Sequence, residues 1–264
     1  MKHQFKIIVV FVCIFLCNPF AYSAEENDLS KAIDSLFDNR EGRPGCAVGV
    51  INNGKYIHKR GYGLANLEHN ISIDENSIFR IGSISKQFTA MAIAILEEKG
   101  LLAFDDEMQK HIPDLIDYGE EVTINQMIHH FSGLGDYEDM DYPGRFKNAV
   151  DEEFRWGNED YLTNKEFYAL IKTLPLFRKP ERKFWYSNAG YALLTLVAQN
   201  VSGLNLRELA ERDIFKPLAM NDTFFNDDVN LIIKNRADGY SPIKGKPGQY
   251  KINMTNLSWV GDGG

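Results

Sequence analysis

A serine and a lysine stand three residues apart in FRIGSISKQFTAMAIAI, where a polar stretch gives way to a long apolar run. If Ser83 caps a helix that begins at Ile84, Lys86 lies about one turn further along and on the same side. Such a pair can be a nucleophile with its proton acceptor beside it. The alternative from the pattern alone is a capped helix with a solvated lysine.

The chemistry requires Lys86 to be buried. A serine hydroxyl becomes a good nucleophile only with a base in hydrogen-bond reach, and a lysine can serve as that base only in its neutral form, which burial favours. The apolar neighbours Ile84, Phe88 and Ala92 predict such burial. The dipole of a helix that starts near Ser83 would also favour negative charge there.

About one Ser-x-x-Lys is expected by chance in a chain of this length, and a second does occur, from Ser241 to Lys244. It runs directly into Gly245 and Pro247, so no long helix can follow it and its lysine is expected to be solvated. The sequence therefore favours the pair at Ser83.

A second pattern lies in KFWYSNAGYALL, where Tyr186 and Asn188 flank Ser187 just before another apolar helix. Residues two apart in an extended segment project to the same side, so a phenol and an amide would face one place. Alone, the pattern favours the alternative, a tyrosine packed on a helix cap.

The remaining elements indicate an α+β fold. Asn52, Asn53 and Gly54 between two apolar runs predict a β-hairpin over residues 46–63. From Ser83 to about residue 220 the pattern is mainly helical, and residues 236–264 read as loops or weak hairpins. This order suggests a sheet with flanking helices and a helical insertion between its parts.

The N-terminus has the features of a secretory signal peptide over residues 1–24: Lys2 and Lys6, an apolar run over 7–16, then small residues up to Ala24. The apolar run is too short to span a bilayer. We therefore expect a secreted or periplasmic protein in which residues 25–264 form one domain.

The charge and the cysteines exclude some classes of function. Loss of residues 1–24 would remove two lysines and no acid, and take the net charge from −8 to −10. Such a chain is unsuited to nucleic acid or anionic membranes. Cys13 and Cys17 would leave with the signal, so Cys46 would have no partner; we expect a buried thiol and no disulfide scaffold.

Four segments in order resemble the serine β-lactamase-like family, the branch that holds class C β-lactamases, D-alanyl-D-alanine peptidases and related esterases. They are FRIGSISKQFTAMAIAILEEKGLLAFDD, VTINQMIHHFSGL, FWYSNAGYALLTLVAQNVSGL and DIFKPLAMNDTFF. The resemblance covers residues 28–264. The resemblance implies a β-lactamase/transpeptidase-like fold. It also implies a reaction that uses no cofactor and no metal.

Roles for four residues follow from the resemblance. It implies that Ser83 is the acylated nucleophile, that Lys86 is a proton shuttle, that Tyr186 is a general base or acid, and that Asn188 positions the substrate amide and the lysine. The segment HHFSGL has a structural role in the family, so it gives its two histidines, His129 and His130, no catalytic or metal role.

The third motif of the family, a Lys or His followed by any residue and Gly on the strand beside the site, is not found. Lys246-Pro247-Gly248 matches by letters, but it precedes GDGG, and Pro247 is poorly suited to a central strand. We therefore expect a domain that is incomplete at its C-terminal end, without the remaining sheet strands and one donor of the oxyanion hole.

The function predicted is that of a secreted, monomeric serine hydrolase that forms an acyl-enzyme with β-lactam, peptidoglycan stem-peptide or ester substrates. A different serine hydrolase is disfavoured because the chain has no Gly-x-Ser-x-Gly. The alternative is an inactive or weakly active remnant, or a binding module, of the same fold.

Overall fold

The computed structural model describes residues 28–136, 164–253 and 258–263, and these form two compact units. The first unit contains the residues up to 77 together with 240–251, and the second contains residues 78–239 and those from 252 onward. The predicted signal peptide, residues 1–24, lies outside the described residues. Among the described residues, no helix has the length and apolar character needed to cross a membrane.

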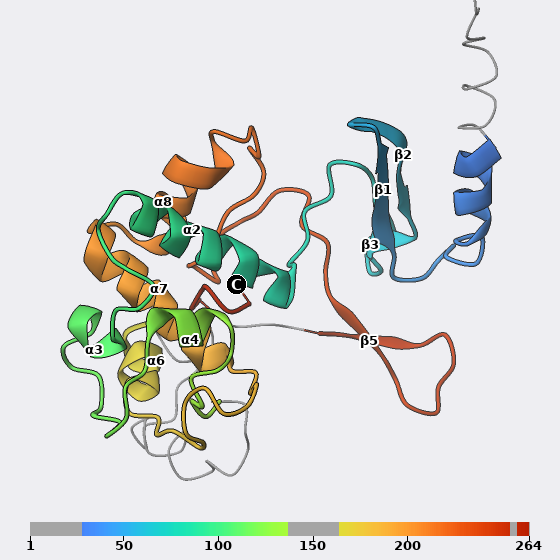
Figure 1. Ribbon diagram of the computed structural model, residues 1–264. Coiled ribbons are helices and arrows are strands. Elements are labelled where there is room, and N and C mark those ends of the chain that lie inside the picture. Colours follow the sequence, from blue (N-terminus) through green and yellow to red (C-terminus); the bar gives the residue numbers. More distant parts are fainter. Residues whose placement is uncertain (1–27, 137–163, 254–257, 264) are drawn as a thin grey trace, which may run out of the picture. The chain divides into compact units, whose positions relative to one another are not determined.

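The predicted hairpin is the main feature of the first unit (Figure 1). Strands β1 (Cys46–Asn52) and β2 (Lys55–Tyr62) pair antiparallel, with Asn52 opposite Lys55. The turn needs left-handed backbone at both central residues, and Asn53 and Gly54 supply it with φ of 49° and 75°. Cys46 is half-buried, so the predicted fully buried thiol is wrong.

Two further antiparallel pairs complete this unit: β3 (Leu64–Asn66) with β4 (Ile71–Ser72), and β5 (Tyr240–Pro242) with β6 (Tyr250–Ile252). Lys246, Pro247 and Gly248 lie in the exposed turn between β5 and β6 and not on a strand. Lys244 is exposed in the same connection, as expected for the rival Ser-x-x-Lys pattern.

A short helix over residues 28–35 is attached to the hairpin by a chain of hydrogen bonds. The hydroxyl of Ser30 lies 2.8 Å from Nδ1 of His58, whose Nε2 lies 2.7 Å from the hydroxyl of Tyr62. Tyr62 donates in turn to Asp34 over 2.7 Å. His58 is buried, so this chain satisfies its ring nitrogens within the fold.

The second unit is mainly helical. Its elements are η1 (Gly82–Ser85), α2 (Lys86–Glu98), α3 (Met108–His111), α4 (Ile124–Ile128), α6 (Asn164–Ile171), α7 (Asn188–Ser202), α8 (Leu206–Ala210) and η3 (Glu211–Phe215). Helix α7 is the central one, and α2, α3, α4, α6 and α8 all pack against it (Figure 1).

The sequence of α7 explains its place and its bounds. Nearly every residue from Asn188 to Ala198 is buried, as expected for a helix that is apolar on all sides and enclosed by others. The hydroxyl of Ser187 caps it by accepting the N–H of Gly190 over 3.1 Å. It ends at Gly203, whose φ of 71° is the usual left-handed termination.

The segment of residues 258–263, which bends at Gly261 and Asp262, runs between α2 and α7 (Figure 1). Thr89 on α2 donates to the carbonyl of Gly261 over 2.8 Å, and Thr195 on α7 donates to the carbonyl of Val260 over 3.0 Å. Both threonines are fully buried. The segment is thereby fixed along its length, and this fixes the carbonyl of Asp262 next in the chain.

Helices together with small antiparallel sheets agree with the predicted α+β class. The order of the elements also agrees, with a hairpin first, then a helical block, then the short pair β5 and β6.

Candidate active site

Ser83 lies at the surface on η1, the 3-10 turn that precedes α2. The prediction that Ser83 caps the long helix is wrong, because α2 begins only at Lys86 and its N-cap is Ser85, whose side chain makes no capping bond. The hydroxyl of Ser83 is engaged elsewhere. It accepts a hydrogen bond from the phenol of Tyr186 over 2.8 Å and one from Nζ of Lys86 over 3.4 Å.

Lys86 is the first residue of α2 and is 6% exposed, so the expected burial is confirmed. Besides Ser83, its Nζ donates to Oδ1 of Asn188 over 2.6 Å and to the carbonyl of Asp262 over 2.5 Å. Three oxygen acceptors match the three donors of an ammonium group. The geometry is therefore that of a fully hydrogen-bonded lysine aimed at the serine.

The source of this burial differs in part from the prediction. Ile84 is 59% exposed, so it is not part of a buried apolar cover for the lysine. Two aromatic rings take its place: Nζ of Lys86 lies 4.9 Å from the ring centre of Tyr186 and 5.4 Å from that of Tyr191. A cation over aromatic faces is stabilised by their quadrupoles.

Tyr186 and Asn188 come together at this place, as their spacing predicts. Ser187 between them has extended backbone, φ −142° and ψ 118°, which sends both neighbours to one side. Tyr186 is 42% exposed and reaches Ser83, whereas Asn188 is buried as the first residue of α7 and reaches Lys86. The four residues named from the sequence thus form one connected group.

Sequence reasoning did not identify Asp136, which is 5% exposed and lies at the N-terminus of α7. Its carboxylate accepts the backbone N–H of Asn188 over 2.9 Å and that of Ala189 over 3.4 Å. A carboxylate in this place stabilises a helix through its free N–H groups and its dipole. Asp136 therefore fixes the start of the helix that carries Asn188, and nothing local in the sequence indicates this pairing.

His130 is a second residue that the sequence left without a role. Its ring lies 4.5 Å from that of Tyr186 and 5.2 Å from that of Tyr191, measured between centres. Burial, and then the charge of Lys86, lower the pKa of His130 from 6.5 to about 4. Burial also raises the pKa of Tyr191. At neutral pH the imidazole beside the group is uncharged.

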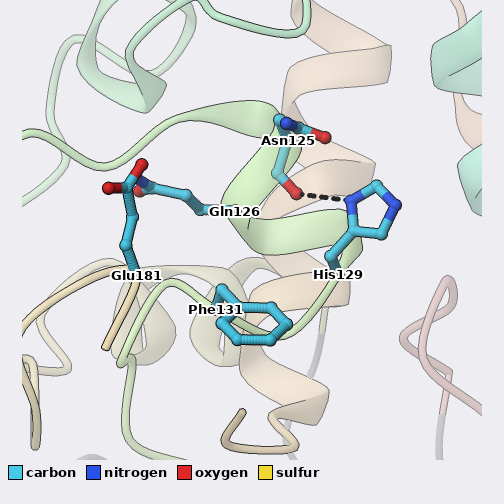
Figure 2. A pocket seen from close by; sticks show the side chains of 5 residues that line it. All are labelled: Asn125, Gln126, His129, Phe131 and Glu181. Atoms are coloured by element: carbon cyan, nitrogen blue, oxygen red, sulfur yellow. Dashed lines mark hydrogen bonds between the residues drawn. The ribbon is translucent and has the colours of Figure 1, made fainter. Parts of the chain in front are cut away.

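A separate open pocket of about 360 Å³ lies beside α4 and is lined by Asn125, Gln126, His129, Phe131 and Glu181. Figure 2 shows His129 turned back onto its own helix, where Nδ1 lies 2.9 Å from the carbonyl of Asn125. None of the four predicted site residues lines this pocket. Within the described part of the chain, no three His, Cys, Asp or Glu side chains gather in a way that could hold a metal ion.

The family model described as Beta-lactamase matches residues 33–250, most of the chain. The chain belongs to the Beta-lactamase family. The resemblance noted in the sequence is thus confirmed, and the hairpin, α2 and α7 are elements of that family's domain.

Among curated relatives, penicillin-binding protein 4* of Bacillus subtilis (strain 168) is 29% identical over 172 residues, which are 64% of this chain and 35% of that protein. Protein flp of Staphylococcus aureus (strain MRSA252) is 29% identical over 238 residues, 84% of this chain and 44% of that protein. The chain therefore spans less than half the length of these family members.

Solved structures agree on the fold. The octameric penicillin-binding protein homologue from Pyrococcus abyssi has a TM-score of 0.69 at 30% identity, over 90% of this chain and 52% of that one. A class C β-lactamase has a TM-score of 0.65 at 21% identity, over 94% of this chain and 61% of that one. The predicted β-lactamase/transpeptidase-like fold is confirmed.

Proposed function

We propose that this protein is an exported serine hydrolase that acts through an acyl-enzyme on Ser83. The observation that carries the proposal is the convergence of two proton-bearing side chains, the phenol of Tyr186 and Nζ of Lys86, on the one exposed hydroxyl of Ser83. A serine nucleophile needs a base within hydrogen-bond distance, and either group is such a base in its unprotonated form. A serine that only capped a helix would need no base.

The proposed reaction begins with attack of Oγ of Ser83 on a carbonyl carbon. As the new C–O bond forms, the hydroxyl proton passes to the Tyr186 and Lys86 pair, one member of which must enter the step unprotonated, as a phenolate or a neutral amine. The pair then returns that proton to the leaving nitrogen or oxygen as the bond to it breaks. Water then attacks the ester on Ser83 by the reverse route, and Ser83 regains its proton. We treat the two residues as one proton-transfer unit, because both contact the same oxygen of Ser83.

Asn188 is assigned two tasks in this proposal. Its Oδ1 holds Nζ of Lys86, and its amide Nδ2 can donate to the carbonyl oxygen of a substrate amide. Because Asn188 is the first residue of α7 and Asp136 fixes that helix end, its position is set by the fold and not by the substrate.

The proposed substrates are β-lactams, peptidoglycan stem peptides and simple esters. Proteins similar to this chain include penicillin-binding proteins, β-lactamases and EstCE1, a hydrolase with promiscuous acyltransferase activity. All of these substrates present a carbonyl that one serine can attack. Export rests on the N-terminal sequence, and the likeness to penicillin-binding proteins supports it.

The test is turnover by the full-length protein of a chromogenic cephalosporin, a nitrophenyl ester and an acylated D-alanyl-D-alanine peptide. We expect hydrolysis of at least one, and a loss of at least about 10³-fold in Ser83→Ala. The matched control is Ser241→Ala, the serine of the other Ser-x-x-Lys pattern, which should behave as wild type. Binding without turnover would support a binding module, and equal turnover by Ser83→Ala would exclude the proposal.

A further inference from the structure

His130 contacts the segment that carries the catalytic tyrosine at three successive residues. Its backbone carbonyl accepts the N–H of Trp185 over 2.8 Å, and its ring lies against that of Tyr186. Its Nδ1 accepts the backbone N–H of Ser187 over 3.2 Å. His130 therefore contacts Tyr186 and both of its neighbours in the chain.

The hydrogen bond to Ser187 requires one form of the imidazole. A nitrogen that accepts an N–H carries no proton, so His130 must be neutral with its hydrogen on Nε2. The ionisable groups that face it are Lys86 of α2, Tyr191 of α7, the adjoining Tyr186 and its neighbour His129. None of these is a carboxylate that would stabilise an imidazolium ion.

The backbone of His130 is also unusual. It has a φ of 60°, in the left-handed region that few residues other than glycine adopt, although histidine and asparagine do so more often than most. It follows directly on His129, the C-cap of α4. The residue is thus held in an uncommon conformation at the point where the chain leaves α4, and there its carbonyl and its ring both contact residues 185–187.

We propose that His130 is a positioning residue for the reaction: its neutral imidazole holds residues 185–187 so that the phenol of Tyr186 stays on Ser83. This inference rests on the proposed function for its catalytic consequence. It assigns to His130 a role that the Tyr-x-Asn and Ser-x-x-Lys patterns do not contain.

The proposal has a consequence for pH. Protonation of His130 removes the acceptor for Ser187 and adds a positive charge beside Lys86. Acylation of Ser83 should therefore fall as the pH approaches the pKa of His130, which burial and Lys86 lower to about 4. Part of the acid limb of the rate profile should then belong to His130.

Two variants separate the hydrogen bond from the ring. His130→Asn removes the ring but places an amide oxygen near the position of Nδ1, and asparagine tolerates the left-handed backbone. His130→Phe keeps a ring but has no acceptor. The adjoining His129→Asn is the matched control, because His129 is exposed and touches none of the four site residues through the contacts described.

The readout is the rate of Ser83 acylation in the full-length protein by a fluorophosphonate, with the noncovalent and covalent steps measured separately. We expect His130→Asn to lose less than about tenfold and His130→Phe about 10²-fold, the usual cost of misplacing a catalytic group. The loss should lie in the covalent step, and the His130→Asn profile should lack the part of the acid limb assigned to His130. A merely structural residue would lower the melting temperature and leave the covalent step of the folded protein unchanged.

A second readout does not depend on activity. Amide hydrogen exchange at Ser187 should be slow in the wild type and in His130→Asn but fast in His130→Phe, and nitrogen NMR should show the Nε2–H form of His130 at neutral pH. Equal acylation and equal protection of Ser187 in all three proteins would overturn the proposal. If the wild type is not acylated at all, the proposed function fails, and the exchange of Ser187 alone then decides whether His130 holds the segment.

Discussion

The phenol of Tyr186 donates a hydrogen bond to Oγ of Ser83 over 2.8 Å, although 103 residues separate them in the chain. The tyrosine comes from the segment before α7 and the serine from the turn before α2, and these two helices pack against each other. The distance between the two oxygens is therefore set by helix packing, which is stiff.

Tyr186→Phe removes this bond and keeps the ring in place. We expect the rate of Ser83 acylation to fall by about 10²- to 10⁴-fold, the usual contribution of a positioned proton-transfer group. Stability should change little, because the tyrosine is 42% exposed. The measurement is acylation by a fluorophosphonate together with a thermal melt.

Tyr191→Phe is the control for that variant. Its hydroxyl donates to the carbonyl of Ile128 over 2.9 Å and not to Ser83, so its loss should cost about 1 kcal/mol of stability and little rate. If both variants slowed acylation equally, the phenol of Tyr186 would have no special role.

Several local signals in the sequence predicted the structure correctly. The turn at Asn53 and Gly54 needs only their own backbone preferences, and the bounds of α7 follow from its cap at Ser187 and from Gly203. Tyr186 and Asn188 lie on the same side of the chain, and the extended backbone of Ser187 between them was enough to predict this.

The helix cap at Ser83 was predicted wrongly, and the contacts between distant segments were not predicted at all. Ser83 lies on a 3-10 turn, and its partners are the distant Tyr186 and the lysine of the next helix. His130 and Asp136 act through contacts 52 to 57 residues away along the chain, and no spacing rule connects them with Ser187 or Asn188.

Lys86→Met tests the second half of the proposed proton-transfer pair. It leaves two buried acceptors, on Asn188 and Asp262, without their donor, which costs about 1–3 kcal/mol each when a buried group loses its partner. We expect acylation to fall by about 10²- to 10⁴-fold. Stopped-flow or quenched acylation assays on folded protein measure the rate.

The double variant, Lys86→Met combined with Tyr186→Phe, tests whether the two residues act together. Residues that act as one unit are not additive, so the double should be no more than about tenfold slower than the slower single. Losses that multiply would show that the lysine and the tyrosine act in independent steps.

We expect His130 to make the free energy of unfolding depend on pH. Its pKa is about 4 in the folded protein and 6.5 ordinarily, so between these values the unfolded chain binds more protons. Its contribution to the free energy of unfolding is therefore complete above about pH 6.5 and is lost as the pH falls toward 4. Urea titrations at several pH values in this window measure it.

His130→Asn should remove this part of the pH dependence, and the control His129→Asn should keep it. A His130→Asn curve parallel to the wild type would mean that the imidazole is not held neutral by its surroundings.

We expect substitution of Gly261 to cause a large loss of stability. Its φ is 106°, and a Cβ there would lie 1.9 Å from Oγ1 of Thr195. Gly261→Ala should therefore cost more than about 3 kcal/mol, beyond most single substitutions. It should also slow acylation, because it displaces the neighbouring carbonyl of Asp262 from Lys86.

Gly203→Ala is the matched control, since Gly203 has a φ of 71° but open space around it. It should cost only the penalty of left-handed backbone, about 1–2 kcal/mol. Denaturant midpoints compare the two; equal losses would show that Gly261 is not confined by Thr195.

The most direct measurement of the central claim is the site of the covalent adduct. Full-length protein is treated with a fluorophosphonate or a β-lactam, digested with trypsin, and the peptide of residues 81–86 is fragmented, since it holds both the exposed Ser83 and the buried Ser85. The proposal predicts one adduct, on Oγ of Ser83, and none in Ser83→Ala. An adduct on Ser85, Ser187 or Ser241, or undiminished labelling of Ser83→Ala, would contradict it.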